Sequence, residues 1–159
     1  VNGVSKGYSM TGWRIGYAAG PAPLIAAMKK IQGQSTSNPT SISQAAATEA
    51  LNGDQSCIGP MRKAFKERHD FVVERLNKMN GVSCKPAQGT FYCFPNVQGA
   101  IEQLGLKNDV ELAEHLIQEA GVALVPGSAF GLEGYARISY ATSMENLQKA
   151  MDRLGKAFA

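Results

Sequence analysis

The chain has 159 residues, enough for one ordinary domain core, and its composition of 44% apolar and 18% charged residues is typical of a globular protein. Its 16 basic and 13 acidic side chains are spread along the sequence, which argues against the basic tracts of nucleic-acid-binding or membrane-binding proteins. No apolar stretch approaches the roughly 20 residues that span a bilayer. From the charge distribution and this absence, we expect a cytoplasmic protein that binds neither nucleic acid nor a membrane.

The first predicted elements surround a lysine and an arginine. Residues 3–16 read GVSKGYSMTGWRIG, which places Lys6 in a loop of small residues and Arg14 eight positions later. The short and mostly apolar stretch after the loop, residues 14–19, predicts a buried strand. A lysine in such a loop is most often simply solvated, but its amine becomes a nucleophile toward aldehydes when burial or a nearby cation lowers its pKa. Because Arg14 is close to Lys6 in the sequence, Lys6 fits the interpretation as a nucleophilic amine.

Helical patterns follow. We expect helices over residues 21–33, stopped by Gly33, over residues 41–52, opened by a capping box of Ser41 and Gln44, and over residues 61–79, ended by Asn80 and Gly81. The third is long enough to bridge two parts of an enzyme.

From residue 82 onward, short strands alternate with helices. The expected strands are 82–85, 90–94, 122–125 and 135–141, and the expected helices are 109–120 and 144–158. Capping boxes of Asn108 with Glu111 and of Thr142 with Glu145 begin the two helices. We therefore divide the chain near residue 55 into a remnant built around the lysine, residues 1–55, and a compact α+β domain, residues 56–159.

Arg137 is the second candidate anchor for an anion. In the predicted strand it shares one face with Tyr135 and Ser139, while Ile138 and Tyr140 share the other. A lone strand arginine is usually a rim residue with a solvated head group.

The three cysteines are far apart and lack C-x-x-C spacing, which argues against a disulfide framework or a zinc site. We expect reduced, buried thiols and no bound metal.

Residues 3–16 resemble, position by position, the pyridoxal-phosphate attachment motif of class I aminotransferases. The likeness covers essentially the whole chain and is closest to the bacterial aspartate aminotransferase branch. It runs through VNGVSKGYSMTGWRIGYAAGP, QSTSNP, GTFY at 89–92, VALVPGSAFG at 122–131 and ARISYATSMENLQKAM at 136–151.

The resemblance implies the α/β architecture of fold-type I pyridoxal-phosphate enzymes, with an α+β C-terminal domain, working as a homodimer. Residues 1–55 then correspond to the end of the large cofactor-binding domain, and residues 56–159 to the small C-terminal domain. We expect the chain to be the C-terminal part of a longer protein.

The resemblance also implies roles for three residues. Lys6 would form the Schiff base with the aldehyde of pyridoxal 5'-phosphate and then shuttle a proton, Arg14 would pair with the cofactor phosphate, and Arg137 would grip the α-carboxylate of the substrate. Phe91 resembles an aromatic residue near the substrate, but it fits a core position nearly as well. Ser37 and Asn38 resemble a loop that crosses the dimer interface, or else form an ordinary polar turn. His69 and His115 are interpreted as structural or surface residues.

The expected function is that of an aspartate aminotransferase, which moves an amino group between L-aspartate, or another amino acid, and a 2-oxo acid such as 2-oxoglutarate. One alternative is an aromatic, prephenate or broad-specificity aminotransferase, because the residues that read the side chain lie mainly upstream or across the dimer in relatives. Another is a catalytically silent folding and dimerisation fragment, because most of the cofactor's partners in relatives also lie upstream.

Overall fold

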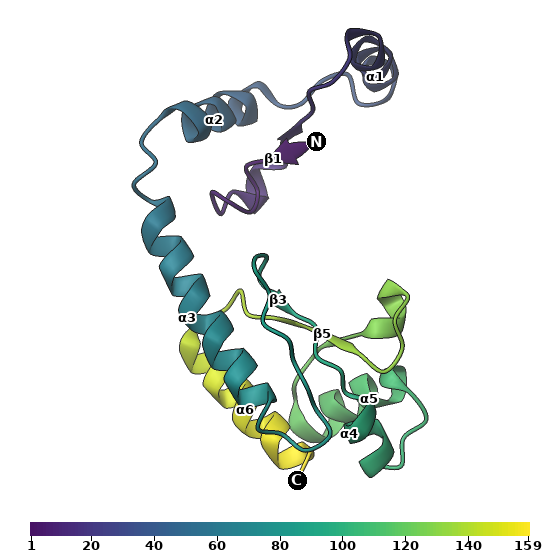
Figure 1. Cartoon of the computed structure of the whole chain (residues 1–159). Coiled ribbons are helices and arrows are strands. Elements are labelled where there is room, and N and C mark those ends of the chain that lie inside the picture. Colours follow the sequence, from purple (N-terminus) through teal and green to yellow (C-terminus); the bar gives the residue numbers. More distant parts are fainter. The chain divides into compact units, whose positions relative to one another are not determined.

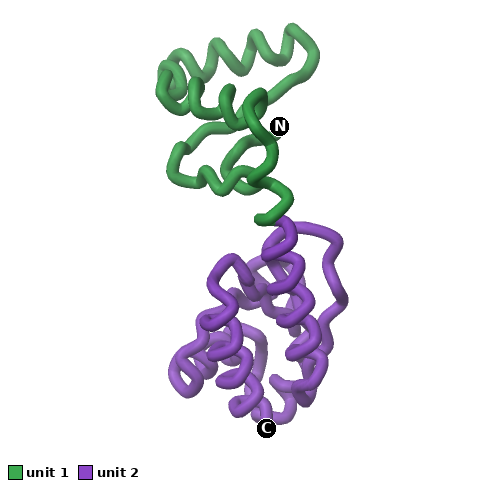
Figure 2. The backbone as a smooth tube through the Cα atoms, turned by 90° about the vertical axis from the view of Figure 1, so that its left-hand side faces the viewer, with its two compact units in different colours: residues 1–61 green, residues 62–159 purple.

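The computed structural model describes all residues, 1–159, and they form two compact units (Figure 2). The first unit is Val1–Met61 and the second is Arg62–Ala159. The division falls inside helix α3 (Ile58–Leu76), whereas the sequence pattern places it near residue 55. No helix combines the length and the apolar character needed to cross a membrane.

The first unit begins with a small antiparallel hairpin (Figure 1). Strand β1 (Asn2–Gly3) pairs with strand β2 (Gly16–Tyr17), and the 3-10 turn η1 (Thr11–Trp13) lies in the connection. The strand expected over residues 14–19 is therefore reduced to two residues. Its first residue, Arg14, has left-handed dihedral angles (φ 51°, ψ 50°), which are incompatible with an extended strand.

Helix α1 (Ala22–Ser35) follows the hairpin, with Pro23 in its first turn as the sequence suggests. The expectation that Gly33 stops this helix is wrong. The helical hydrogen bonding continues past it, and the Thr36 N–H still donates to the Gln32 carbonyl oxygen at 2.9 Å. A glycine inside a helix costs about 1 kcal/mol relative to alanine, which neighbouring helical bonds can outweigh.

Helix α2 (Ser41–Asn52) has the expected bounds, but the expected capping box is absent. Thr40 is the N-cap residue and makes no side-chain capping bond. The Gln44 side-chain amide instead donates to the Pro39 carbonyl oxygen at 2.8 Å. The loop before the helix competes for the side chain that a capping box would use.

The second unit contains a three-stranded antiparallel sheet in the order β3-β5-β4, with helices packed against it (Figure 1). In chain order its elements after α3 are β3 (Tyr92–Cys93), α4 (Gln98–Gln103), α5 (Asp109–His115), the π-helical turn η2 (Leu116–Ala120), β4 (Val125–Pro126), the 3-10 turn η3 (Gly127–Phe130), β5 (Ala136–Ser139) and α6 (Met144–Ala157). Helix α4 is not anticipated by the sequence pattern.

The strands of this sheet are shorter than expected. Residues 82–85 contribute only one bridge, between Ser83 and Asn96, and helix α3 ends at Leu76 rather than near residue 79. The pairing of Tyr92 with Ser139 and of Val125 with Arg137 makes β5 the central strand. Arg137 therefore lies in the middle of the sheet, flanked by a strand on either side.

The two later capping predictions have different outcomes. The Asn108 side chain accepts from the backbone N–H groups of Val110 and Glu111, so the predicted N-cap of α5 is confirmed. The capping box is incomplete, because the Glu111 side chain accepts from the Lys107 N–H instead of the Asn108 N–H. At α6 the N-cap is Ser143, whose Oγ accepts from the Asn146 N–H at 3.2 Å, and not Thr142. Both residues are of the type that caps helices, so α6 begins at Met144 as expected, but the capping residue is the one next to Thr142.

The core of the second unit lies between the sheet and the helices α3 and α6, which run side by side in Figure 1. The apolar stripe expected on α6 is buried there: Leu147, Met151, Leu154 and Phe158. Ala136 and Tyr140 of the sheet face the same core. Cys84 and Cys93 are buried in it as expected, but Cys57 is exposed, so the expectation of buried thiols is wrong for that residue.

Candidate active site

Lys6 and Arg14 lie on one connection at one end of the hairpin in the first unit. Gly3 and Gly16 form the last pair of the two strands, so residues 4–15 make up the whole connection. Lys6 follows this pair on one side and Arg14 precedes it on the other. The hairpin therefore presents a primary amine and a guanidinium at the same end of a short sheet.

The backbone around Lys6 is held in a turn. Val4, only 1% exposed, anchors the start of the connection. The Tyr8 N–H donates to the Val4 carbonyl oxygen at 3.3 Å, and the Ser9 N–H donates to the Lys6 carbonyl oxygen at 3.2 Å. The Lys6 side chain itself is exposed. The backbone of this turn is thus anchored by Val4, while the Lys6 side chain that it bears is exposed.

Arg14 occupies a left-handed backbone position at the other end of the connection. Its Nη1 donates to the Thr11 carbonyl oxygen at 3.0 Å, and its side chain is exposed. The preceding residue is tied to helix α2, because the Ser43 hydroxyl donates to the Trp13 carbonyl oxygen at 2.8 Å. A guanidinium has five N–H donors in a planar fork, so most of this fork remains available for an anion.

These two groups suit a ligand that carries both an aldehyde and a phosphate. A lysine amine condenses with aldehydes, and a planar, permanently charged fork binds phosphate oxygens in pairs. The residues of the hairpin therefore fit pyridoxal 5'-phosphate, the cofactor that the sequence motif implies.

Arg137 lies in the second unit, on the sheet face opposite the core. Ala136 on strand β5 and Tyr140 directly after the strand are buried in the core, whereas Arg137 is half-buried. No carboxylate forms an ion pair with it. A central, partly desolvated arginine without a protein counter-ion is suited to bind an external carboxylate.

Two aromatic rings contact the Arg137 guanidinium. Its Cζ atom lies 4.4 Å from the ring centroid of Tyr92 and 4.4 Å from that of Phe130. Sequence reasoning missed both residues. The pairing of Tyr92 with Ser139, which places Tyr92 beside Arg137, is visible only in the structure, because strand alternation in GTFY does not show which strand it pairs with. Phe130 lies in a turn and gives no periodic signal.

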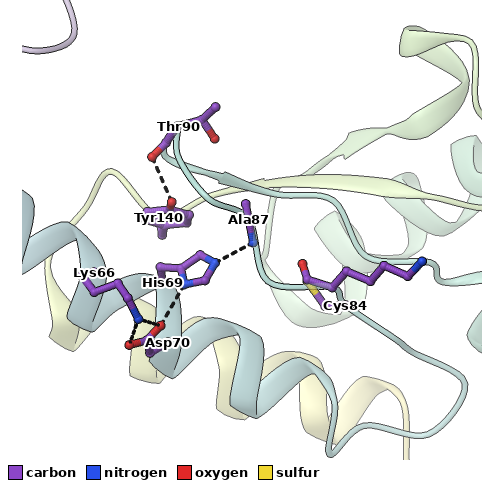
Figure 3. Close-up of polar contacts among 8 residues, drawn as sticks. Lys66, His69, Asp70, Cys84, Ala87, Thr90 and Tyr140 are labelled. Atoms are coloured by element: carbon purple, nitrogen blue, oxygen red, sulfur yellow. Dashed lines mark hydrogen bonds and ion pairs between the residues drawn. The ribbon is translucent and has the colours of Figure 1, made fainter.

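A loop that leads into strand β3 is held by two buried side chains (Figure 3). His69 Nε2 accepts from the Ala87 N–H at 3.0 Å, and the Tyr140 hydroxyl donates to the Thr90 carbonyl oxygen at 2.9 Å. Thr90 has a positive φ of 69°, uncommon for a residue that is not glycine. His69 is therefore structural, as the sequence suggests, and the loop it holds is the one that carries Phe91.

Phe91 lies directly after this loop. Its ring centroid is 4.3 Å from that of Tyr92, and its carbonyl oxygen accepts from the Tyr140 N–H at 3.0 Å. Phe91 thus adjoins the ring that contacts Arg137, and it also packs against the core of the second unit. The core position expected for Phe91 is confirmed, and contact with a substrate stays a prediction.

Two of the side chains near this loop that Figure 3 labels, Tyr140 and Asp70, have shifted pKa values. Burial, with smaller contributions from Cys93 and Asp70, raises the pKa of the Tyr140 hydroxyl above its usual range. Hydrogen bonds from Lys66 and then His69 lower the pKa of the Asp70 carboxyl. Asp70 Oδ1 lies 2.9 Å from His69 Nδ1, so with Nε2 acting as an acceptor, Nδ1 carries the proton. This tautomer is the one that can hold Ala87.

Ser37 and Asn38 form an exposed turn between α1 and α2. Ser37 has a positive φ of 64°, and the Asn38 side-chain amide donates to the Pro39 carbonyl oxygen at 3.0 Å. The polar-turn interpretation accounts for these bonds. Contact with a second subunit stays a prediction for this segment.

The expected site residues are thus distributed over the two units. Lys6 and Arg14 share one connection of the first unit, and Arg137 belongs to the second unit. Each unit carries one half of the chemistry that the motif implies: the amine with a phosphate-binding group, and the carboxylate-binding group.

A family model described as "Aminotransferase class I and II" matches residues 1–154. Among curated relatives, the aspartate/prephenate aminotransferase of Nitrosomonas europaea is 53% identical over 97% of this chain and 40% of its own length. The aspartate aminotransferase of Geobacillus stearothermophilus is 48% identical over 97% of the chain and 39% of its own length. The chain therefore spans about two fifths of the relatives that it matches.

Solved structures show the same partial coverage. The aspartate aminotransferase of Rhizobium meliloti superposes with a TM-score of 0.93 and 47% identity, over 98% of this chain and 40% of its own. An aromatic aminotransferase of Pyrococcus horikoshii superposes with a TM-score of 0.88 and 42% identity, over 98% of this chain and 41% of its own.

Proposed function

Because the chain belongs to the class I and II aminotransferases, we propose that it is the C-terminal part of a pyridoxal-phosphate-dependent aspartate aminotransferase. The full protein would move an amino group between L-aspartate and a 2-oxo acid such as 2-oxoglutarate. The observation that carries this proposal is the hairpin connection with Lys6 and Arg14 at its two ends. Relatives named aspartate aminotransferase, about half identical to this chain, support the choice of substrate.

Lys6 and Arg14 would hold the cofactor. Arg14 binds its phosphate with the N–H donors that Thr11 does not use, and Lys6 supplies the amine that meets its aldehyde. When bound, pyridoxal phosphate supplies the electron sink that makes the Cα–H bond of an amino acid acidic. The Lys6 Nζ would then move a proton between that Cα and C4′ of the cofactor, a role for which its long flexible stem gives the reach.

Arg137 would bind the α-carboxylate of the substrate. Two parallel N–H···O bonds from the guanidinium fix both the position and the plane of a carboxylate. Such a grip orients the Cα–H bond for proton removal. Because Arg137 has no carboxylate partner of its own in the chain, it needs to break no ion pair to accept the substrate.

The test uses the full-length protein that contains this chain. With aspartate and 2-oxoglutarate, Lys6→Ala should lower kcat by roughly 10²-fold or more, while the matched control Lys30→Ala, an exposed lysine of α1, should leave it unchanged. Arg14→Ala should weaken cofactor affinity by about 10- to 100-fold. Activity retained in Lys6→Ala would refute the proposal.

A second candidate substrate class is aromatic amino acids or prephenate. It is favoured by relatives named aspartate/prephenate aminotransferase and by the likeness to an aromatic aminotransferase structure. Comparing kcat/KM for aspartate, phenylalanine and prephenate in the same full-length protein separates the two. If aspartate is the poorest of the three, the aspartate assignment is wrong and the aromatic one replaces it.

We further propose that the full protein is a homodimer, as is typical of the family. Sedimentation velocity of the full-length protein should give twice the mass of one chain.

By contrast, the isolated 159 residues should be catalytically silent, because they span only two fifths of the length of the relatives. Incubated with pyridoxal phosphate and borohydride, they should acquire no stoichiometric label on Lys6. A full label, absent from Lys6→Ala, would show that this part of the chain binds the cofactor alone.

A further inference from the structure

Arg137 is surrounded by a set of contacts that reaches beyond its own strand. We propose that Tyr92, Phe130 and Asp109 are positioning residues for Arg137. The two rings hold the guanidinium between them, and the buried Asp109 holds the turn that carries Phe130. The inference rests on the proposed function in one respect only, namely that Arg137 binds a carboxylate.

The two rings reach Arg137 from opposite sides of its strand. Tyr92 belongs to β3, and Phe130 belongs to the turn η3 that directly follows β4. These strands flank β5 on either side. Both ring centroids lie 4.4 Å from the Arg137 Cζ atom, well inside the distance of about 6 Å for a cation–π contact.

The two rings contact the guanidinium but leave its N–H donors available for other hydrogen bonds. A ring contacts a cation through its π face and accepts none of the N–H groups as a carboxylate would. The fork therefore keeps its donors for the substrate, while its long side chain is already ordered. An arginine that is ordered before binding loses less conformational freedom when it grips a ligand.

Asp109 holds the turn that delivers Phe130. It is 1% exposed, and its Oδ2 accepts from the Ser128 N–H at 2.6 Å. Its Oδ1 is buried and has no hydrogen-bond partner. Burying a carboxylate oxygen without a hydrogen-bond partner costs free energy. We infer that this cost is tolerated because Asp109 fixes the turn that bears Phe130.

The same turn is held at its start by close backbone contacts. The Gly127 N–H donates to the Tyr135 carbonyl oxygen at 2.8 Å. A Cβ atom at Gly127 would lie 2.3 Å from the Leu132 carbonyl oxygen, so only glycine fits there. The contacts of Gly127 and Ser128 restrain the backbone that leads to Phe130, which is itself 48% exposed. An exposed phenylalanine on a turn with a restrained backbone is suited to contact the guanidinium of Arg137.

The experiment measures carboxylate binding in the full-length, cofactor-loaded protein. Phe130→Leu and Tyr92→Leu each remove one ring and should raise KM for the amino acid and Kd for succinate and 3-phenylpropanoate by roughly 3- to 30-fold. The value of kcat should change less than threefold. Tyr92→Phe keeps the ring and should restore wild-type affinity, and Leu132→Ala, an exposed neighbour of the turn, should not alter it. Because Phe130 is about half exposed, its replacement should not prevent folding.

A double-mutant cycle shows whether the rings act through Arg137. In an Arg137→Gln background, Phe130→Leu should have no further effect on Kd, because the group that the ring holds is gone. Asp109→Ala should raise Kd in the wild-type background, and Asp109→Asn, which keeps an oxygen for Ser128, should raise it less. Additive effects of Phe130→Leu and Arg137→Gln would overturn the inference.

The outcomes separate the two proposals. If Arg137→Gln itself leaves carboxylate binding unchanged, the role of Arg137 in the proposed function is wrong. If Arg137→Gln weakens binding but neither ring variant does, Arg137 keeps its role and the positioning by Tyr92 and Phe130 is refuted. If the ring variants lower kcat as strongly as they raise KM, the rings support the fold of the site in general, which also contradicts the inference.

Discussion

Replacing Tyr140 by phenylalanine removes one hydroxyl group from a residue that is 3% exposed. That hydroxyl donates to the Thr90 carbonyl oxygen at 2.9 Å. A hydrogen bond contributes about 0.5–1.5 kcal/mol net, and more is lost when its partner is left buried and unpaired. Thr90 is exposed, so water can replace the hydroxyl. We therefore expect Tyr140→Phe to lower the free energy of unfolding by about 1 kcal/mol.

Chemical denaturation followed by circular dichroism measures this loss. The matched control is Tyr135→Phe, at the end of the same strand region, because no hydrogen bond involves the Tyr135 hydroxyl and its ring stacks on Phe94 in either case. The control should lose less than about 0.5 kcal/mol. Equal losses in the two variants would refute the reasoning, since the Thr90 bond would then contribute nothing.

The same variant has a pH signature. Burial raises the pKa of Tyr140 in the folded protein, so folding favours the neutral hydroxyl. This contribution to stability is fully present below the unfolded pKa of about 10 and is lost as the pH rises through the higher folded pKa. The stability difference between wild type and Tyr140→Phe should therefore shrink from about pH 9 to about pH 11. A difference that stays constant over this range would contradict the assigned direction.

Three further stability predictions follow from single contacts, each measured by the same denaturation. Ser143→Ala should cost about 1 kcal/mol because it removes the N-cap of α6; a larger loss for Thr142→Ala would show that the cap is misplaced. Gly127→Ala should cost several kcal/mol, since its Cβ would clash with backbone, whereas Gly59→Ala in open space should gain up to about 1 kcal/mol; similar effects of the two would contradict the packing. Met151→Ala, at a 1% exposed core position, should cost about 2–5 kcal/mol, and a loss below about 1 kcal/mol would mean that the core collapses around it.

Sequence periodicity predicts the helices of this chain better than its strands. The stripe of α6 is buried as expected because four apolar residues recur at one face of a helix, which is a local property. Strand length instead depends on where a partner strand begins and ends. Residues 82–85 find only the Ser83–Asn96 bridge, so their apolar pattern is not converted into a strand. Cap positions fall between these cases, since Thr142 and Ser143 are chemically equivalent and hydrogen-bond geometry decides between them.

The roles expected for Lys6, Arg14 and Arg137 come from the resemblance of short segments to a family, and they stay predictions. Strand alternation also predicts the face that Arg137 shares with Tyr135 and Ser139. The contacts of Tyr92 and Phe130 with Arg137 could not be inferred in this way. They depend on the strand order β3-β5-β4, and no local pattern encodes that order. This order brings Tyr92 close to Arg137, which lies 45 positions later in the chain, and Phe130 lies 38 positions after Tyr92.

Arg14 has a consequence for attempts to engineer this protein. Its left-handed backbone would cost a glycine nothing, but costs a residue with a Cβ atom about 1–2 kcal/mol. A screen for thermal tolerance alone would therefore select glycine at position 14, and the selected protein would melt at a higher temperature but would lack the guanidinium that we propose binds the cofactor phosphate. In that proposal, stability and ligand affinity oppose each other at this one residue. A stabilised variant of the hairpin should be built around an unchanged Arg14, with the gains sought in α1 and α2 instead.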